Sequence, residues 1–390
     1  MPTKPKKIFL IVGTRPEFIK LAPLYLKMKE LDLKPYWVQT NQHKELIEDL
    51  KDFWDIYPDF EFNLENKDLS LAELSSKLLL ESSLLFETEK PDLVIVQGDT
   101  LSAAEAARAA FYLKAKQNIE IAHVEAGIRT TNILSPFPEE FNRRTISEIA
   151  DYHFCPSEIS FKTLCKEKNI NSAYAGEANI YLTGNTGIDA LLLVKKKIKA
   201  KLGSERDKYI LITSHRKENL VNGMQIKLCE VIYKILKTFK EEQSLTRNPK
   251  FLVSLHSNPL AQKNFLDLNS KLNSENIEGL ELINSCAYPE FIKLMSNSLF
   301  IITDSGGIQE EAPYLNKFAL ILREEIEREE VYLFEQAEKL INNSQEIEEM
   351  VLRRLKISKK SKAQEYEIQE SSKFYGNGTS SELICNKFIP

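Results

Sequence analysis

The stretch Leu299-Phe300-Ile301-Ile302-Thr303-Asp304-Ser305-Gly306-Gly307-Ile308-Gln309-Glu310-Glu311-Ala312-Pro313 joins an apolar run to a segment with helical character. The apolar run predicts a buried strand, and the Ser-Gly-Gly sequence forms the turn into a helix. Glycines let backbone N–H groups approach an anion at a helix N-terminus, and the serine adds a hydroxyl donor. Glu310 or Glu311 could accept hydrogen bonds from ribose or sugar hydroxyls. These features favour a nucleotide-sugar site, although a tight turn with a Ser or Asp helix cap explains the segment alone equally well.

The same alternation of short apolar runs and longer amphipathic segments extends over the whole chain. Segments between the runs, such as Leu21–Leu31 and Leu71–Glu87, have helical spacing. Repeated strand–helix alternation predicts an α/β fold with parallel sheets and helices on both faces. The candidate strands are Lys7–Val12, Lys34–Gln39, Leu93–Gln97, Glu120–Val124, Tyr152–Cys155, Ile180–Leu182, Tyr209–Thr213, Lys250–Ser254, Leu280–Ile283, Leu299–Thr303 and Phe318–Leu322.

Length and strand spacing together predict two doubly wound domains. A chain of 390 residues is too long for one typical core, and the strands fall into two sets. We expect domains at 1–190 and 191–370, with a last helix in 371–390. Ligands of such sheets bind at the carboxyl ends of the strands, so we expect the site in a cleft between the domains.

Composition excludes several classes of function. The chain has 43% apolar and 28% charged residues and a net charge of −5, which gives no case for nucleic-acid binding. Its five cysteines have no CxxC pair or zinc spacing, so we expect reduced cytosolic thiols and no metal site. The first apolar run, Ile8 to Val12, is too short for a signal peptide or a membrane span. No GxGxxG or P-loop motif is present.

Cations follow the first predicted strand, in Gly13-Thr14-Arg15-Pro16-Glu17-Phe18-Ile19-Lys20. Pro16 suits the first turn of a helix, and Arg15 and Lys20 then lie near its positive end. The alternative is that both side chains are solvated and have no function, but two cations in one turn after a strand favour anion binding. Asp99 follows another strand and is either a helix cap or a catalytic carboxylate.

Three carboxylates, Glu125, Glu139 and Glu140, lie close together in sequence. Paired carboxylates can share proton abstraction and donation if their environments separate their pKa values. An ion-pair network with Arg129, Arg143 and Arg144 explains them equally well. In the second half, His215 follows a strand beside Arg216 and is a candidate phosphate contact, and His256 is placed similarly.

Together these residues resemble the non-hydrolysing UDP-N-acetylglucosamine 2-epimerases. The resemblance covers residues from near 8 to about 320, in the order of the family. It implies a GT-B fold of two Rossmann-like domains, with the C-terminal helix packed back on the first domain. It also implies a homodimer, a UDP-N-acetylhexosamine substrate, no cofactor and no membrane or nucleic-acid partner. The matching segments are Gly13–Lys20, Gly98–Thr100, His123–Thr130, Ser135–Arg143, Thr183–Leu191, Thr213–Asn219 and Thr303–Pro313.

The implied reaction is inversion at C2 of the sugar by elimination and re-addition of UDP, through 2-acetamidoglucal. Carried over by position, the catalytic residues are Asp99, Glu125, Glu139 and His215. The substrate-binding residues are Arg15, Lys20, Arg143, Ser305, Gly306, Gly307, Glu311 and Arg328. Developing negative charge on the departing diphosphate explains the need for the cations. The resemblance also implies a bacterial cytoplasmic enzyme that supplies precursors of surface polysaccharides.

The resemblance implies a second, activating substrate site near Gln42, His43 and Glu140. One departure from the family pattern stands near the end of the match. The family usually reads Glu-Arg-Pro-Glu where this chain has the sequence 327–330, Glu-Arg-Glu-Glu. Arg328, which the resemblance implies as a contact for uridine or phosphate, is kept, whereas Glu329 replaces the proline.

Three other functions remain open from the sequence. A hydrolysing epimerase would release free N-acetylmannosamine and UDP, and a GT-B glycosyltransferase would pass the sugar to an acceptor. A nucleotide-sugar sensor would bind without turnover. The carboxylates Asp99, Glu125 and Glu139 argue against the transferase, which needs no acid/base groups on both faces of C2.

Overall fold

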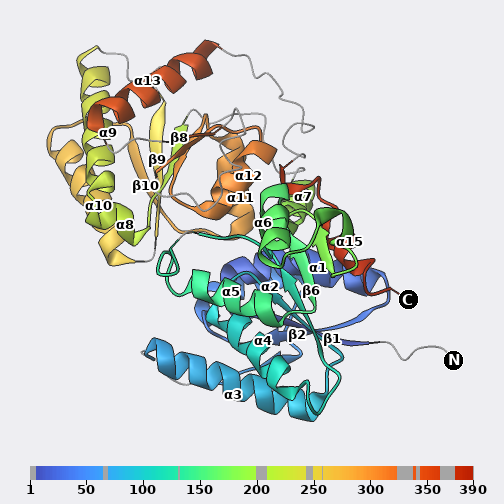
Figure 1. Cartoon of the computed structure of the whole chain (residues 1–390). Coiled ribbons are helices and arrows are strands. Elements are labelled where there is room, and N and C mark those ends of the chain that lie inside the picture. The colour runs from blue at the N-terminus through green and yellow to red at the C-terminus, as the bar shows by residue number, and fades with distance from the viewer. Residues whose placement is uncertain are drawn as a thin grey trace. The chain divides into compact units, whose positions relative to one another are not determined.

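The computed structural model describes residues 6–64, 69–130, 132–198, 209–242, 249–256, 258–322, 337–339, 343–360 and 374–389. The chain divides into two compact units. The first consists of Met1–Leu193 and Lys373–Pro390, and the second of Val194–Ser372. Each unit is built on its own parallel sheet with helices packed around it (Figure 1). The predicted α/β class is therefore confirmed.

The first unit holds a seven-stranded sheet in the order β3-β2-β1-β4-β5-β6-β7. Short 3-10 turns lie at Lys44–Leu46 and Ser172–Tyr174. Its described elements are β1 (Lys7–Val12), α1 (Arg15–Glu30), β2 (Lys34–Gln39), α2 (Glu48–Trp54), β3 (Phe60–Glu61), α3 (Leu71–Glu89), β4 (Leu93–Gln97), α4 (Leu101–Leu113), β5 (Glu120–Val124), α5 (Glu139–Ile149), β6 (Tyr152–Cys155), α6 (Glu158–Glu167), β7 (Ile180–Leu182), α7 (Thr186–Ile198) and α15 (Ser380–Cys385).

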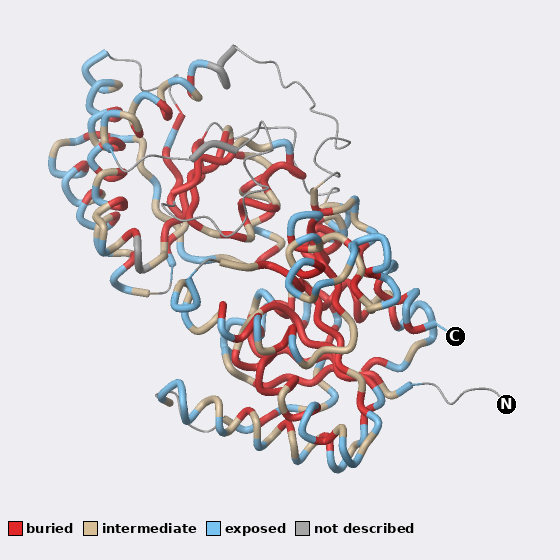
Figure 2. Tube along the Cα trace, viewed as in Figure 1, coloured by how far each residue is buried: buried red, intermediate tan, exposed pale blue. Residues whose placement is uncertain are grey.

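Burial on both faces explains why the central strands read as unbroken apolar runs. All five residues of β4 are buried, and so is every residue of β1 after Lys7. The chain moves one way along the sheet from β1 to β2 and the other way from β4 to β5. Right-handed crossovers therefore place α1 and α4 on opposite faces. Figure 2 shows buried residues following the strands of both units.

The second unit holds a six-stranded parallel sheet in the order β10-β9-β8-β11-β12-β13. No helix in the described ranges is long and apolar enough to cross a membrane. The elements are β8 (Tyr209–Thr213), α8 (Lys217–Val221), α9 (Met224–Glu241), β9 (Lys250–Leu255), α10 (Pro259–Ser274), β10 (Leu280–Asn284), α11 (Tyr288–Asn297), β11 (Ile301–Thr303), α12 (Gly306–Tyr314), β12 (Ala319–Ile321), β13 (Ala337–Lys339) and α13 (Ser344–Lys360).

The C-terminal helix α15 is tied to the first unit by a buried carboxylate. Asp189 on α7 accepts hydrogen bonds from the backbone N–H groups of Ser380, at 3.2 Å, and Ser381, at 2.6 Å. The backbone N–H of Asn185 also donates to the Tyr375 carbonyl at 2.8 Å. A negative charge at a helix N-terminus is favourable, so Asp189 fixes the start of α15 against α7.

A turn glycine sets how closely α6 packs on the end of β5. Gly127 has φ +85, and a Cβ built there would lie 2.2 Å from the backbone oxygen of Ser160. Gly98 also has a positive φ, +70, but a Cβ there would meet no atom of the described part of the chain within 4 Å. Alanine at Gly98 would therefore add backbone strain alone, whereas alanine at Gly127 would add both strain and a steric clash.

We predict that Gly127→Ala costs about 3 kcal/mol of stability, because it adds a backbone clash to the left-handed strain. Gly98→Ala should cost about 1 kcal/mol, from strain alone. Thermal unfolding followed by circular dichroism compares the two variants. Equal losses would contradict the close packing of α6 against this turn.

Candidate active site

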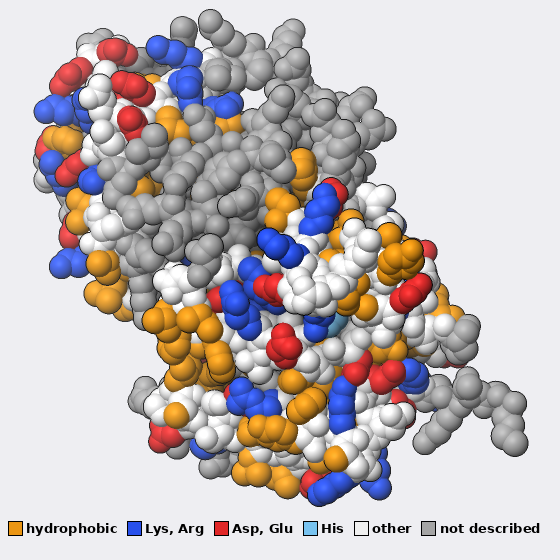
Figure 3. Space-filling view, in the orientation of Figure 1, with side chains coloured by type: hydrophobic (Ala, Val, Ile, Leu, Met, Phe, Trp, Pro, Cys, Tyr) orange, Lys and Arg blue, Asp and Glu red, His pale blue; other side chains and the backbone are white. Residues whose placement is uncertain are grey.

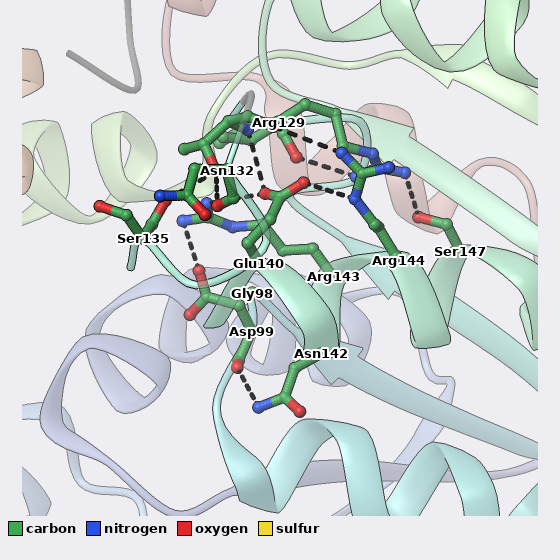
Figure 4. A network of polar contacts seen from close by, with 12 residues as sticks. Gly98, Asp99, Arg129, Asn132, Ser135, Glu140, Asn142, Arg143, Arg144 and Ser147 are labelled. Carbon is green, nitrogen blue, oxygen red and sulfur yellow. Dashed lines mark hydrogen bonds and ion pairs between the residues drawn. The ribbon is translucent and has the colours of Figure 1, made fainter. Parts of the chain in front are cut away.

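Asp99 lies in the turn between β4 and α4, and its neighbours fix the backbone of this turn. The buried His123 ring donates from Nε2 to the Gly98 carbonyl at 2.8 Å. The Asn142 amide donates to the Asp99 carbonyl at 2.8 Å (Figure 4), and the Thr100 hydroxyl caps α4. Burial lowers the pKa of His123 to about 4, so the ring is neutral near pH 7. The main chain of Asp99 is thus held from several sides.

The Asp99 carboxylate is held by Arg143 of α5. Arg143 Nη2 lies 2.6 Å from Asp99 Oδ2, and the Arg143 side chain is only 5% exposed (Figure 4). Such a partly buried pair is screened less than a surface pair and orients the carboxylate. Glu139 precedes Arg143 by four residues on the same helix and so lies on the same face. The face of α5 that holds Asp99 therefore also carries Glu139.

The Glu140 carboxylate is fully buried and binds the protein itself. One oxygen accepts from the Thr130 backbone N–H at 3.0 Å, and the other accepts from Arg144 Nε at 2.8 Å (Figure 4). Arg143 Nη1 lies 3.5 Å from the first oxygen. Glu140 thus holds the loop before α5 and the guanidinium that reaches Asp99. A role for it in binding a second ligand stays a prediction.

Apolar and charged surfaces meet at the start of α5. Figure 3 shows apolar side chains gathered over the first turn of the helix, with charged side chains beside them. Contiguous apolar side chains on a surface are typical of binding sites. The exposed apolar residues of this segment are Ile133, Leu134, Phe137 and Phe141.

Glu125 follows β5 in a strained conformation. Its φ is +71, a region that non-glycine residues rarely adopt and that costs about 1 kcal/mol. Its side chain is 8% exposed and contacts the Lys20 ammonium group of α1. The Gln97 amide at the end of β4 donates to the same carboxylate oxygen at 2.8 Å. Backbone strain with such fixed partners is a feature of functional sites.

A buried carboxylate that the sequence analysis did not single out, Glu17, joins the turns after β1 and β4. Its Oε2 accepts from the backbone N–H groups of Gly13, at 2.9 Å, and Thr14, at 2.7 Å. Its Oε1 accepts from the Thr100 hydroxyl at 2.5 Å. Complete burial raises the pKa of Glu17 to about 7, against the lowering effect of these hydrogen bonds. Glu17 therefore connects the helix of Lys20 to the residue next to Asp99.

Gln42 and His43 lie after β2 and brace the neighbouring turns. Gln42 Oε1 accepts from Ser102 at the start of α4, from the backbone N–H at 3.1 Å and the hydroxyl at 2.7 Å. The His43 backbone N–H donates to the Gly13 carbonyl at 2.8 Å. Arg15, half-buried at the start of α1, pairs with a carboxylate of α2 at 3.4 Å. All three residues thus lie at the carboxyl edge of the first sheet.

In the second unit, β8 and β11 end side by side. Thr213 and Thr303 pair in register, and their hydroxyls lie 2.8 Å apart. His215 follows β8 and Asp304 follows β11, where Asp304 is fully buried. His215 Nδ1 lies 3.2 Å from Asp304 Oδ1. A half-buried imidazole is therefore held at the carboxyl edge of this sheet.

Helix α12 begins directly after Ser305, at Gly306. A Cβ built at Gly307 would meet no atom of the described residues within 4 Å, so these residues leave open space beside the first turn. Backbone N–H groups at a helix start with open space can bind an anion. Glu311 lies four residues after Gly307 on the same helix face, and its Oε1 accepts from the Tyr288 hydroxyl at 2.5 Å. The second sheet edge thus has groups suited to phosphate and hydroxyls.

The structure brings the predicted site residues of each unit to the carboxyl edge of its own sheet. Arg328 lies outside the described residues. No group of His, Cys, Asp and Glu within the described ranges is arranged to hold a metal ion. Local sequence patterns did not point to the residues that hold these turns in place, except that Thr14 and Glu17 match the capping-box pattern. The missed residues are Glu17, Gln97, Asn142 and Asp304.

A family model and a related protein sequence both match most of this chain. A family model described as UDP-N-acetylglucosamine 2-epimerase matches residues 27–388. A UDP-N-acetylglucosamine 2-epimerase of Campylobacter jejuni is 38% identical over 378 residues, covering 88% of this chain and 92% of that protein.

Solved structures agree. A crystal structure of UDP-GlcNAc 2-epimerase from Neisseria meningitidis bound to UDP-GlcNAc has a TM-score of 0.81 and 33% identity, over 97% of this chain and 98% of that one. A UDP-GlcNAc 2-epimerase of Methanocaldococcus jannaschii in complex with UDP-GlcNAc and UDP has a TM-score of 0.77 and 30% identity, over the same shares.

The raised pKa of Glu17 predicts a pH-dependent stability. Between about pH 4.5, the usual value for a glutamate, and about pH 7, the folded protein keeps a proton that the unfolded chain has lost. Stability should therefore fall as pH rises through this window, since the unfolded state binds fewer protons. In Glu17→Gln, the side-chain amide still provides two hydrogen-bonding atoms in place of Oε1 and Oε2, but it does not titrate in this pH range. It should remove this part of the pH dependence.

Urea unfolding at several pH values between 4.5 and 8 measures the effect. Glu158→Gln, at an exposed side chain of α6, is the matched control and should keep the wild-type slope. Identical slopes for the wild type and Glu17→Gln would contradict the assignment.

Proposed function

This chain belongs to the UDP-N-acetylglucosamine 2-epimerase family and is an epimerase with a GT-B type fold, and we propose that it interconverts UDP-N-acetylglucosamine and UDP-N-acetylmannosamine without net hydrolysis. The proposal rests on two carboxylate–cation pairs at the carboxyl edge of the first sheet. There Asp99 is paired with Arg143, and Glu125 is paired with Lys20. Carboxylates held beside cations suit a reaction that moves a proton while negative charge develops on a leaving group.

The chemistry explains why both kinds of group are needed. The C2 proton of the sugar is weakly acidic until the C1–O bond to UDP begins to break. As that bond breaks, its electrons go to the diphosphate, and the C2–H electrons form the C1=C2 bond of 2-acetamidoglucal. A proton then adds to the other face of C2, and a diphosphate oxygen of UDP bonds to C1 again. A base on one face and an acid on the other therefore invert C2.

We assign the proton transfers to Asp99, Glu125 and Glu139. Asp99 and Glu125 follow neighbouring strands of the first sheet. Glu139 lies on the face of α5 that holds Asp99, and its place in the first turn of the helix favours the charged carboxylate. The local contacts of the three differ, and different environments let carboxylates act separately as acid and base.

We assign the diphosphate contacts to the cations and to the start of α12. Arg15, Lys20 and Arg143 provide positive charge in the first unit, and His215 does so in the second. Ser305, Gly306 and Gly307 offer donors to the phosphates, and Glu311 suits a ribose hydroxyl. The contact of Arg328 with uridine or phosphate stays a prediction from the family resemblance.

Several wider proposals rest on the family resemblance. We propose a homodimer in the cytoplasm that supplies UDP-N-acetylmannosamine for surface polysaccharide. A second substrate molecule at Gln42, His43 and Glu140 would act as an activator. Gln42→Ala with unchanged substrate cooperativity would count against that activator site.

Proton NMR of the protein with UDP-N-acetylglucosamine in D2O tests the reaction. Reversible formation of UDP-N-acetylmannosamine with deuterium at C2 is the expected result. Free N-acetylmannosamine with UDP would instead identify the hydrolysing alternative. An unchanged spectrum that changes only when a sugar acceptor is added would identify a glycosyltransferase.

We predict that Asp99→Asn, Glu125→Gln and Glu139→Gln each lower kcat by about 100-fold or more, because each removes a group that transfers a proton. The substitutions are nearly isosteric, so circular dichroism should stay unchanged. Glu158→Gln on the exposed face of α6 is the control and should keep wild-type kcat. Full activity in any of the three variants would remove that residue from the proton-transfer scheme.

A further inference from the structure

The buried Asp304 carboxylate uses one oxygen for the turn after β8. Its Oδ2 accepts from the backbone N–H groups of His215, at 2.9 Å, and Arg216, at 3.1 Å. It also accepts from the Ser214 hydroxyl and the Asn219 amide, each at 3.0 Å. This oxygen alone accounts for a structural role in joining the ends of β8 and β11.

The other oxygen has a different environment. Asp304 Oδ1 is buried and accepts no hydrogen bond from the described residues. The nitrogen Nδ1 of His215 lies 3.2 Å from it, as an ion pair would place it. A buried carboxylate oxygen is costly without a partner, and the His215 imidazole is placed to pair with it when its Nδ1 carries a proton. A role limited to holding the turn leaves this contact unexplained.

A second imidazole covers the face of the His215 ring. The rings of His215 and His256 are stacked, with centroids 4.9 Å apart and planes inclined by 10°. His256 Nδ1 accepts from the Asn258 backbone N–H at 3.1 Å, so that nitrogen carries no proton. With its edge held by this hydrogen bond, the His256 ring covers one face of the His215 ring.

We propose that Asp304 and His256 are positioning residues for His215, which set its Nδ1 proton and its ring plane so that Nε2–H donates to the diphosphate. The proposal rests on the proposed function for the role of His215. Asp304 accepts Nδ1–H at the ring edge and stabilises positive charge on the ring as the diphosphate leaves. The His215 side chain remains 34% exposed, so its far edge is accessible to a ligand.

The substitution Asp304→Asn tests the proton at Nδ1. The asparagine oxygen can replace Oδ2 for the four donors, and its NH2 group then faces His215 Nδ1. Because two donors cannot face each other, Nδ1 must lose its proton. Ser214→Ala is the matched control, since it removes one donor to Oδ2 and leaves the ring contact in place.

Nitrogen NMR of protein labelled with 15N-histidine, assigned with a His215→Gln sample, reads the proton directly. We expect a protonated Nδ1 of His215 in the wild type and in Ser214→Ala, and an unprotonated Nδ1 in Asp304→Asn. An unprotonated Nδ1 in the wild type, or the same state in the wild type and Asp304→Asn, would overturn the proposal. This measurement needs no turnover, so it is independent of the proposed reaction.

Kinetics then test the consequence for catalysis. We expect Asp304→Asn to lower kcat by on the order of 100-fold, with the protein still folded by circular dichroism. His256→Ala should lower kcat roughly 3- to 10-fold, and His256→Phe, which keeps an aromatic face, should restore most of it. Normal kcat in Asp304→Asn, or equal losses in the two His256 variants, would overturn the proposal. If the wild type has no epimerase activity but gives the expected NMR result, the proposed function is refuted. The contact between Asp304 and His215 Nδ1 is then still supported.

Discussion

Each unit depends on a buried carboxylate that ties together the turns after two adjacent parallel strands. Parallel strands end at one edge with backbone N–H groups that have no partner in the sheet. Glu17 accepts such groups after β1 and reaches Thr100 after β4. Asp304, after β11, accepts the corresponding groups after β8. Burying a carboxylate is costly, and several hydrogen bonds offset that cost only in one arrangement of the turns. The turns at the carboxyl edge of each sheet are thus fixed before any ligand binds.

Further contacts at the first sheet edge hold the carboxylates that we assign to proton transfer. Asp99 follows a turn glycine, and its backbone and carboxylate are both held by α5. Glu125 is kept in a left-handed conformation while its carboxylate contacts Lys20 and Gln97. Groups whose positions are set in advance need no reorganisation when charge moves in the reaction.

The sequence predicted the strands far better than the contacts between turns. Strands buried on both faces read as apolar runs, and all the predicted strands are present, although β11 begins at Ile301 rather than Leu299. Among the described residues, two strands were not predicted, because β3 has only two residues and β13 is a short polar segment, Ala-Glu-Lys. The residues Glu17 and Thr100 are 83 positions apart in the sequence, so no local pattern predicts their contact. From the sequence, Glu17 is an ordinary residue of a helix N-terminus and Asp304 an ordinary turn residue, so neither pattern predicts the contacts that they make between turns.

The two sheet edges carry different chemistry, and this division has a physical reason. The carboxylates assigned to proton transfer belong to the first unit, whereas the helix start of α12 and the Asp304–His215 pair belong to the second. A carboxylate near the diphosphate would repel it, so the carboxylates of the first unit are paired with cations, Asp99 with Arg143 and Glu125 with Lys20. Asp304 avoids this conflict, because its charge is fully buried and its oxygens face backbone N–H groups and the imidazole. Asp304 can therefore support the leaving group by acting through His215.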